Sequence, residues 1–146
     1  MARPTRFILA AVLLSGCAST APTPTPTDFA LVTAERAYRA GAPIRFSLTN
    51  GSDAAVWYQF CAAYIDLERD VGDGEYQFVE EGTGRPDCIL SLKLLPAQQT
   101  EEGVLDLADD LQGGLYRLAT RVYPSLGADR RGPPIGVATP PFEVLP

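Results

Sequence analysis

The sequence of 146 residues contains no histidine. This absence excludes Ser-His-Asp and Cys-His catalysis and removes imidazole as a metal ligand. A phosphate-binding glycine loop and a CxxC motif are also missing. Adjacent carboxylates occur at 80–81, 101–102 and 109–110, but neighbouring residues on a strand point to opposite faces and cannot share a substrate. We therefore expect no catalytic residue, no metal site and no cofactor.

Positive charge and long apolar runs are also scarce. Without Arg3 and Arg6, 12 − 2 = 10 basic side chains remain against 18 acidic ones, a net charge of −8. Nucleic acid is disfavoured as a partner because phosphates must be met by clusters of Lys and Arg. The first apolar block, residues 7–14, is much shorter than the roughly 20 residues of a membrane-spanning helix.

The residues that surround this block form an export signal, with two arginines before it and small residues after it. Leu14-Ser15-Gly16-Cys17 resembles the lipobox of bacterial lipoproteins. The resemblance implies that residues 1–16 are removed and that an acylated Cys17 anchors the chain to the membrane. Ala18, where an Asp would favour the inner membrane, implies the outer membrane. The alternative is an ordinary secretory signal, cut a few residues later, with Cys17 discarded.

Residues 17–27 continue from this cysteine into a spacer of alternating Thr and Pro. Such a sequence favours extended polyproline II structure and has no apolar face to bury. At ~3.1 Å per residue, residues 19–27 would hold a domain up to ~28 Å from the lipid. Residues 28–146 are then one domain of ordinary size.

The other two cysteines form an even pair if Cys17 is acylated. An oxidising compartment would join Cys61 and Cys88 in a disulfide. The two positions are 88 − 61 = 27 residues apart, and closing such a loop stabilises a fold by about 3 to 4 kcal/mol. The alternative is two buried free thiols.

Helical signals are scarce in the domain, whereas alternating apolar and polar residues recur at short spacing. Asp73-Gly74 separates two such runs and predicts a tight hairpin turn. The pattern predicts an all-β sandwich or barrel. The expected strands are residues 29–34, 43–50, 55–60, 64–69, 75–80, 89–95, 103–109, 115–123 and a final run within 136–146, and in 89–95 we expect Leu90, Leu92 and Leu94 on one side.

Two stretches resemble bacterial immunoglobulin-like domains. The first is YRAGAP at 38–43 with the run that follows it, and the second is LADDLQGGLYRLATRVY at 107–123. The resemblance implies an immunoglobulin-like antiparallel β-sandwich of about seven to eight strands. It also implies that Tyr116 forms a tyrosine corner, in which the phenol bonds to backbone a few residues upstream. Trp57 alternates out of phase with Val56 and Tyr58, so either Trp57 or Tyr58 with Phe60 lies outside the core.

Two segments are candidates for binding. The loop 124–136 carries Arg130 and Arg131, which could meet a carboxylate or an anionic polymer, although a solubilising turn explains them as well. Asp70, Asp73 and Glu75 lie beside a glycine turn, as calcium ligands do, but their spacing does not fit an EF-hand and favours a plain hairpin.

From these observations we expect a non-catalytic, lipid-anchored, immunoglobulin-like module of the bacterial cell envelope that acts in protein interaction or in envelope structure. Its partners would be the membrane, through the lipid, and an envelope protein. The alternative is an inhibitor of an envelope or extracellular protease, because the domain also resembles small bacterial proteinase inhibitors that share the Y-x-x-G-x-x opening. A carboxylate enzyme would need two convergent acids in a pocket.

Overall fold

The computed structural model describes residues 23–59, 65–79, 92–124 and 133–146. Within these ranges the chain forms one short 3-10 helix and eleven strands, and no helix is long and apolar enough to cross a membrane. In chain order they are η1 (Pro26–Asp28), β1 (Phe29–Thr33), β2 (Ala37–Arg39), β3 (Pro43–Asn50), β4 (Val56–Gln59), β5 (Asp66–Gly72), β6 (Glu75–Phe78), β7 (Leu92–Leu95), β8 (Gln99–Asp106), β9 (Gly114–Tyr123), β10 (Ile135–Ala138) and β11 (Phe142–Leu145).

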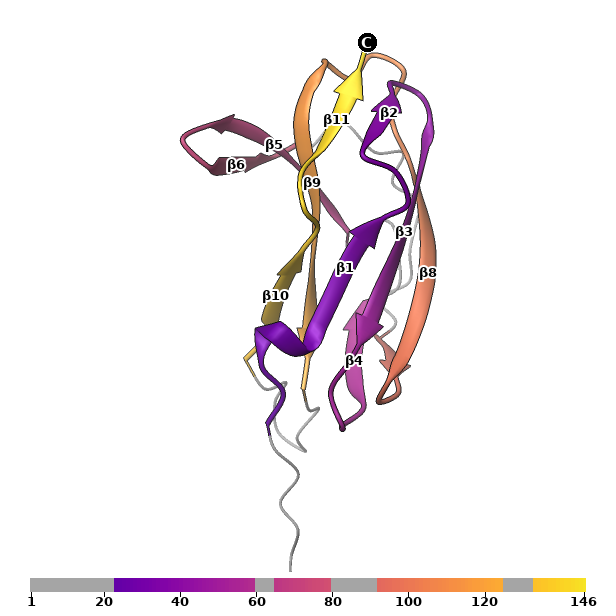
Figure 1. Cartoon of the computed structure of the whole chain (residues 1–146), viewed down its shortest axis with the longest axis vertical. Coiled ribbons are helices and arrows are strands. Elements are labelled where there is room, and N and C mark those ends of the chain that lie inside the picture. The colour runs from indigo at the N-terminus through magenta and orange to yellow at the C-terminus, as the bar shows by residue number, and fades with distance from the viewer. Residues whose placement is uncertain (1–22, 60–64, 80–91, 125–132) are drawn as a thin grey trace, which may run out of the picture.

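The strands form two sheets (Figure 1). The smaller sheet has the order β1-β3-β8, and the larger one has the order β2-β11-β9-β4-β7. Neighbouring strands are antiparallel except for β11 and β2, which pair in parallel. The all-β class is therefore confirmed, and the two sheets make the domain a sandwich.

Strand β9 is the centre of the larger sheet. On one side it pairs with β11 and then β10, and on the other with β5 and then β4. Pro140 and Pro141 separate β10 from β11 because proline cannot donate to the ladder. Thr139 bridges the break: its hydroxyl accepts a hydrogen bond from the Leu118 N–H at 3.0 Å, and its own N–H donates to the Leu118 carbonyl at 2.8 Å.

The core lies between the sheets and follows from the alternation of the strands. Ile44 and Leu48 of β3, Leu67 of β5, and Leu118 of β9 are each at most 2% exposed. Ile65 and Leu67 point inward, as the sequence predicts. One continuous apolar cluster joins both sheets, and it includes Phe29, Leu31, Tyr38, Val56, Tyr58, Leu95, Leu105, Tyr116, Val122, Phe142 and Val144.

The strand count is higher than the seven to eight expected, for two reasons. Prolines and turns divide expected runs, as at β10 and β11. Strand β2 has only three residues, too few to show an alternating pattern, and it forms because it pairs with β11. It ends in the Y-x-x-G turn, where Gly41 has φ +78° and the Ala42 N–H donates to the Arg39 carbonyl at 3.0 Å.

Strands β4 and β7 differ in which side chains face the core. Val56 and Tyr58 are buried and Trp57 is only half-buried, so Trp57 lies outside the main core. In β7, Leu92 and Leu94 lie on one side, as expected, but that side faces away from the core: Leu95 is buried, whereas Leu94 is 44% exposed. Leu90 lies outside the described residues. The cause is the register with β4, in which Leu95 pairs with the buried Val56 and Leu94 pairs with Trp57.

The long axis of the domain has two distinct ends (Figure 1). Helix η1, where the described chain begins, lies near one end, which we call the η1 end. Thr25 caps it, with its backbone N–H donating to Asp28 Oδ2 at 2.6 Å, and this hydrogen bond lowers the pKa of the Asp28 carboxyl. The C-terminus lies at the opposite end, which we call the far end, and the β5–β6 hairpin projects sideways nearer to it.

Candidate functional site

The described residues contain no group of three or more Cys, Asp or Glu side chains placed to hold a metal ion. Asp70, Asp73 and Glu75, which lie beside the hairpin turn, are not such a group. Asp70 instead shapes the hairpin, because its Oδ1 accepts a hydrogen bond from the Gly72 N–H at 2.8 Å. The adjacent pairs 101–102 and 109–110 lie on a strand and a turn, and none of their carboxyl groups is fully buried.

Tyr116 fixes the turn that precedes β9. Its hydroxyl donates a 2.6 Å hydrogen bond to the carbonyl of Gln112, four residues upstream, and the residue is 1% exposed. Its ring stacks on Phe142 with a centroid separation of 6.5 Å. Burial raises the pKa of the phenol, so the hydroxyl keeps the proton that it donates. This geometry is that of a tyrosine corner.

The domain is an immunoglobulin-like sandwich. No protein-family model matches the sequence, and no curated protein matches it. The structure is similar to the ASH/PapD-like domain (PapD-like domain 7) of human CEP192, with 12% sequence identity and a TM-score of 0.38. That alignment covers 97% of this chain and 98% of the other.

Replacing Tyr116 with Phe should lower the free energy of unfolding by about 1 kcal/mol or somewhat more, because a buried hydrogen bond is lost and the Gln112 carbonyl loses its partner. Urea unfolding monitored by circular dichroism measures this loss. Tyr76→Phe is the matched control, because the Tyr76 ring lies on the surface under Arg117. Equal stability of the Tyr116→Phe variant and the wild type would show that the hydroxyl bond contributes nothing.

The β5–β6 hairpin is the feature of the sandwich that projects farthest from it (Figure 1). Its turn has positive φ at Gly72, Asp73 and Gly74, as the Asp-Gly motif predicts. A register shift between Asp70 and Gly72 marks a bulge before the turn. Bulges increase local twist and turn a strand away from its neighbours, which agrees with the projection.

Arg117 of β9 secures the base of this hairpin. Its Nε donates to Glu68 Oε2 at 2.6 Å, and its guanidinium carbon lies 3.8 Å from the centre of the Tyr76 ring. Glu68 belongs to β5 and Tyr76 to β6, so one arginine binds both arms of the hairpin to the body. An arginine that is stacked and ion-paired in this way preorganises the surface of the hairpin, which lowers the entropic cost of binding a partner.

A cleft of about 770 Å³, the hairpin cleft, lies between the hairpin and the turn before β9. Arg69 is held on its wall: Nη1 donates to Gln112 Oε1 at 2.7 Å, and Nη2 donates to the Gly113 carbonyl at 3.3 Å. Val71 and Leu111 contribute apolar surface to the cleft, and Val71 is 55% exposed. The hairpin and its cleft therefore offer fixed polar groups beside exposed apolar side chains.

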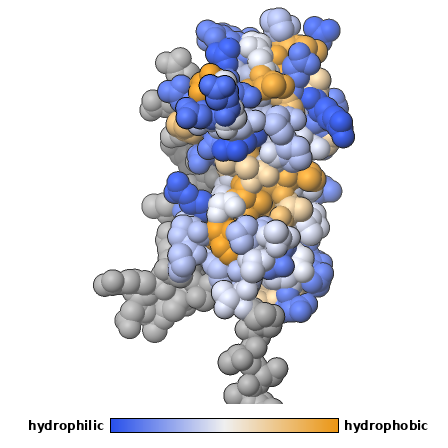
Figure 2. Space-filling view, turned by 60° about the vertical axis from the view of Figure 1, so that its left-hand side comes forward, coloured by the Kyte–Doolittle hydropathy of each residue, from blue (hydrophilic) through white to orange (hydrophobic). Residues whose placement is uncertain are grey.

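The hairpin is strongly acidic. Between residues 66 and 78 it carries five carboxylates and one arginine, which gives 1 − 5 = −4. Figure 2, turned so that this side comes forward, shows hydrophilic residues around the hairpin and hydrophobic residues gathered nearer the middle of the domain. The carboxylates belong to Asp66, Glu68, Asp70, Asp73 and Glu75.

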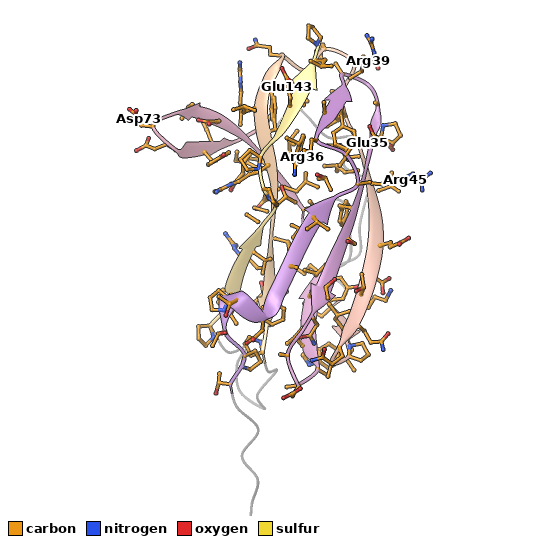
Figure 3. The ribbon with its side chains drawn as sticks, viewed as in Figure 1. Glu35, Arg36, Arg39, Arg45, Asp73 and Glu143 are labelled. Carbon is orange, nitrogen blue, oxygen red and sulfur yellow. The ribbon has the colours of Figure 1, made fainter. Side chains whose placement is uncertain are left out.

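A second concave region, the arginine cleft, lies beside β2 and the start of β3 and has a volume of about 500 Å³. Arg39 and Arg45 line it with Glu35, and its apolar lining includes Ala37, Pro43 and Leu145. Neither arginine side chain has a hydrogen-bond or ion-pair partner within the described residues. Figure 3 shows both arginines on the side of the ribbon away from Asp73, at the tip of the hairpin.

The remaining candidates from the sequence lie outside the described residues: Cys17, Cys61, Cys88, Arg130 and Arg131. The described residues show where the loop 124–136, which carries Arg130 and Arg131, leaves and re-enters the fold. Strand β9 ends at Tyr123 and β10 begins at Ile135, and β10 contacts η1. The sequence did not indicate the hairpin cleft or the arginine cleft as sites, because both depend on strands that are distant in the chain.

Proposed function

We propose that this chain is a non-catalytic, lipid-anchored, immunoglobulin-like module of the bacterial cell envelope that acts by binding another protein. Acylated Cys17 would hold the chain in a membrane, and Ala18 favours the outer membrane. Residues 17–27 would then separate the domain from the lipid. The sequence has no histidine for imidazole-based catalysis, which supports a binding role.

The observation that carries the proposal is the position of the hairpin. The described chain starts at the η1 end, and the hairpin projects from the half nearer the far end (Figure 1). A tether on the η1 side would therefore hold the hairpin at a distance from the lipid, where it projects sideways toward neighbouring envelope proteins. Exposed Val71, fixed Arg117 and Tyr76, and the adjacent cleft are features typical of a protein interface.

Site-specific photo-crosslinking tests this role. A benzophenone amino acid would replace Val71 on the hairpin or Val104 on β8, which have similar exposed fractions of 55% and 49%. We expect a discrete protein adduct from the Val71 position in intact cells that express the full-length chain. The same adduct from Val104, or no adduct from Val71, would contradict binding through the hairpin.

A protease inhibitor is the second candidate, and one observation favours it. An inhibitor must present a convex, fixed loop to a protease cleft, and the hairpin turn at Asp73, held by the bond between Asp70 and Gly72, has that form. A panel of envelope and secreted proteases, assayed with the purified chain, tests this role. Inhibition that disappears when Asp73 and Gly74 are replaced would favour it over the interaction module.

A further inference from the structure

We infer that the hairpin of one copy docks in the arginine cleft of a second copy, so that anchored chains associate side by side in rows. This inference rests on the proposed function, because it names a partner for the hairpin that the proposed function leaves open. The partner is this chain itself. Three independent features of the structure support it: charge, shape and direction.

The charges of the two surfaces are opposite. The hairpin has a net charge of −4, and its turn presents Asp73 and Glu75. The arginine cleft has two guanidinium groups and one carboxylate, a net charge of +1 in a chain that is otherwise acidic. Because Arg39 and Arg45 have no partner within the described residues, both can form charge-assisted bonds with carboxylates of another molecule.

The shapes of the two surfaces are also complementary. The hairpin is convex and exposes Val71, whereas the cleft is concave and has Ala37, Pro43 and Leu145 in its lining. The cleft is preformed: Tyr38 is 6% exposed, and its hydroxyl accepts a hydrogen bond from the Glu35 N–H at 2.9 Å. On the next turn, the Gly41 N–H donates to the Ala108 carbonyl at 3.1 Å. Docking would therefore require little rearrangement of the cleft.

The hairpin and the arginine cleft lie on opposite sides of the domain, as is needed for copies that stand side by side on one membrane. Asp73 lies on one side of the ribbon and Arg39 and Arg45 on the other, and all three lie in the half away from η1 (Figure 3). A sideways translation of one copy, without inversion, brings its hairpin to the cleft of the next. Both chains then keep their η1 ends on the same side, as a shared membrane requires. A contact between different patches does not close on two copies, so it continues into rows.

Zero-length carbodiimide crosslinking of the full chain in its native membrane tests this contact. The reagent joins an amine to a carboxylate that touches it, and Lys93 is the only lysine of the chain. Lys93 is ion-paired with Glu101 in the same molecule, so the link between them is an internal control for the reaction. Arg39→Lys adds an amine in the cleft and keeps its charge. Arg121→Lys, at an exposed position of β9, is the matched control.

We expect the Arg39→Lys chain to give covalent dimers and longer products, on the order of tenfold more than Arg121→Lys, because anchoring concentrates the copies. Peptide mass spectrometry should place the links between the introduced amine and Asp70, Asp73 or Glu75. Adding Glu75→Arg should remove the dimers, and adding Arg45→Glu as well should restore them. Equal dimer yields at the two lysine positions, or links only to other proteins, would overturn the inference.

The outcomes separate this inference from the proposed function. If the chain stays in the membrane and Val71 gives an adduct with a different protein while no dimers form, self-association fails and the proposed function stands. If the chain is found in the soluble fraction but still gives the Arg39→Lys dimers, the anchor fails and the self-association stands.

Discussion

Replacing Cys17 with Ala should move nearly all of the chain from the membrane fraction to the soluble fraction. The lipobox resemblance makes the Cys17 thiol the point of acyl attachment. A single acyl chain holds a protein only marginally, whereas two or more anchor it stably. Without the thiol neither acylation nor lipobox cleavage can take place, and residues 7–14 are too short for a spanning helix. Cell fractionation followed by immunoblotting measures the distribution.

Cys88→Ala is the matched control for this experiment. It removes one cysteine of the domain and leaves the signal region unchanged. We expect this variant to remain in the membrane fraction even if its stability falls. A Cys17→Ala chain that fractionates as the wild type does would refute the anchor, and the alternative of a secretory signal cut after Cys17 would then be preferred.

Replacing Asn50 with Ala should destabilise the domain by about 3 kcal/mol or more. Asn50 is fully buried at the end of β3. Its Nδ2 donates to the carbonyls of Ala54, Leu95 and Pro96 at 2.8, 3.2 and 3.0 Å, and its Oδ1 accepts from both the N–H and the hydroxyl of Ser52. Removing the Asn50 amide would leave several buried polar groups without hydrogen-bond partners. Such unpaired groups lower the free energy of unfolding by more than the loss of the hydrogen bonds alone.

Thr49→Ala is the control, because Thr49 is the neighbouring residue and its hydroxyl makes a single bond with Thr100 Oγ1 at 2.8 Å near the surface. We expect it to lower the free energy of unfolding by less than about 1 kcal/mol. Urea unfolding of both variants gives the comparison. If Asn50→Ala lowers the free energy of unfolding by no more than Thr49→Ala does, the hydrogen bonds of Asn50 do not hold the β3–β4 turn to the end of β7.

The sequence predicted those parts of the fold that depend on local pattern. Strands 43–50 and 115–123 alternate cleanly, and the structure has them as β3 and β9 with nearly the same bounds. The turn at Asp73-Gly74 was predicted because few residues accept positive φ. In both cases the physical cause lies within a few residues of the chain.

Features that depend on distant residues were missed. The turn after β3 is held by the Asn50 side chain, whose Nδ2 donates to the carbonyls of Ala54 and of Pro96, 46 residues away. The side of β7 that is buried depends on its register with β4, in which Leu95 pairs with Val56, 95 − 56 = 39 residues earlier in the chain. The two clefts likewise form only when separate strands meet.

The proposed function depends on an acylated Cys17 at the start of the mature chain, with the sandwich held away from the lipid. Intact mass spectrometry of the chain purified from its native membrane tests this claim most directly. We expect a chain that begins at Cys17, with a mass greater than that of residues 17–146 by the mass of a diacylglyceryl group, with or without a further acyl chain. An unmodified chain, beginning at Cys17 or after it, would contradict lipid anchoring through Cys17.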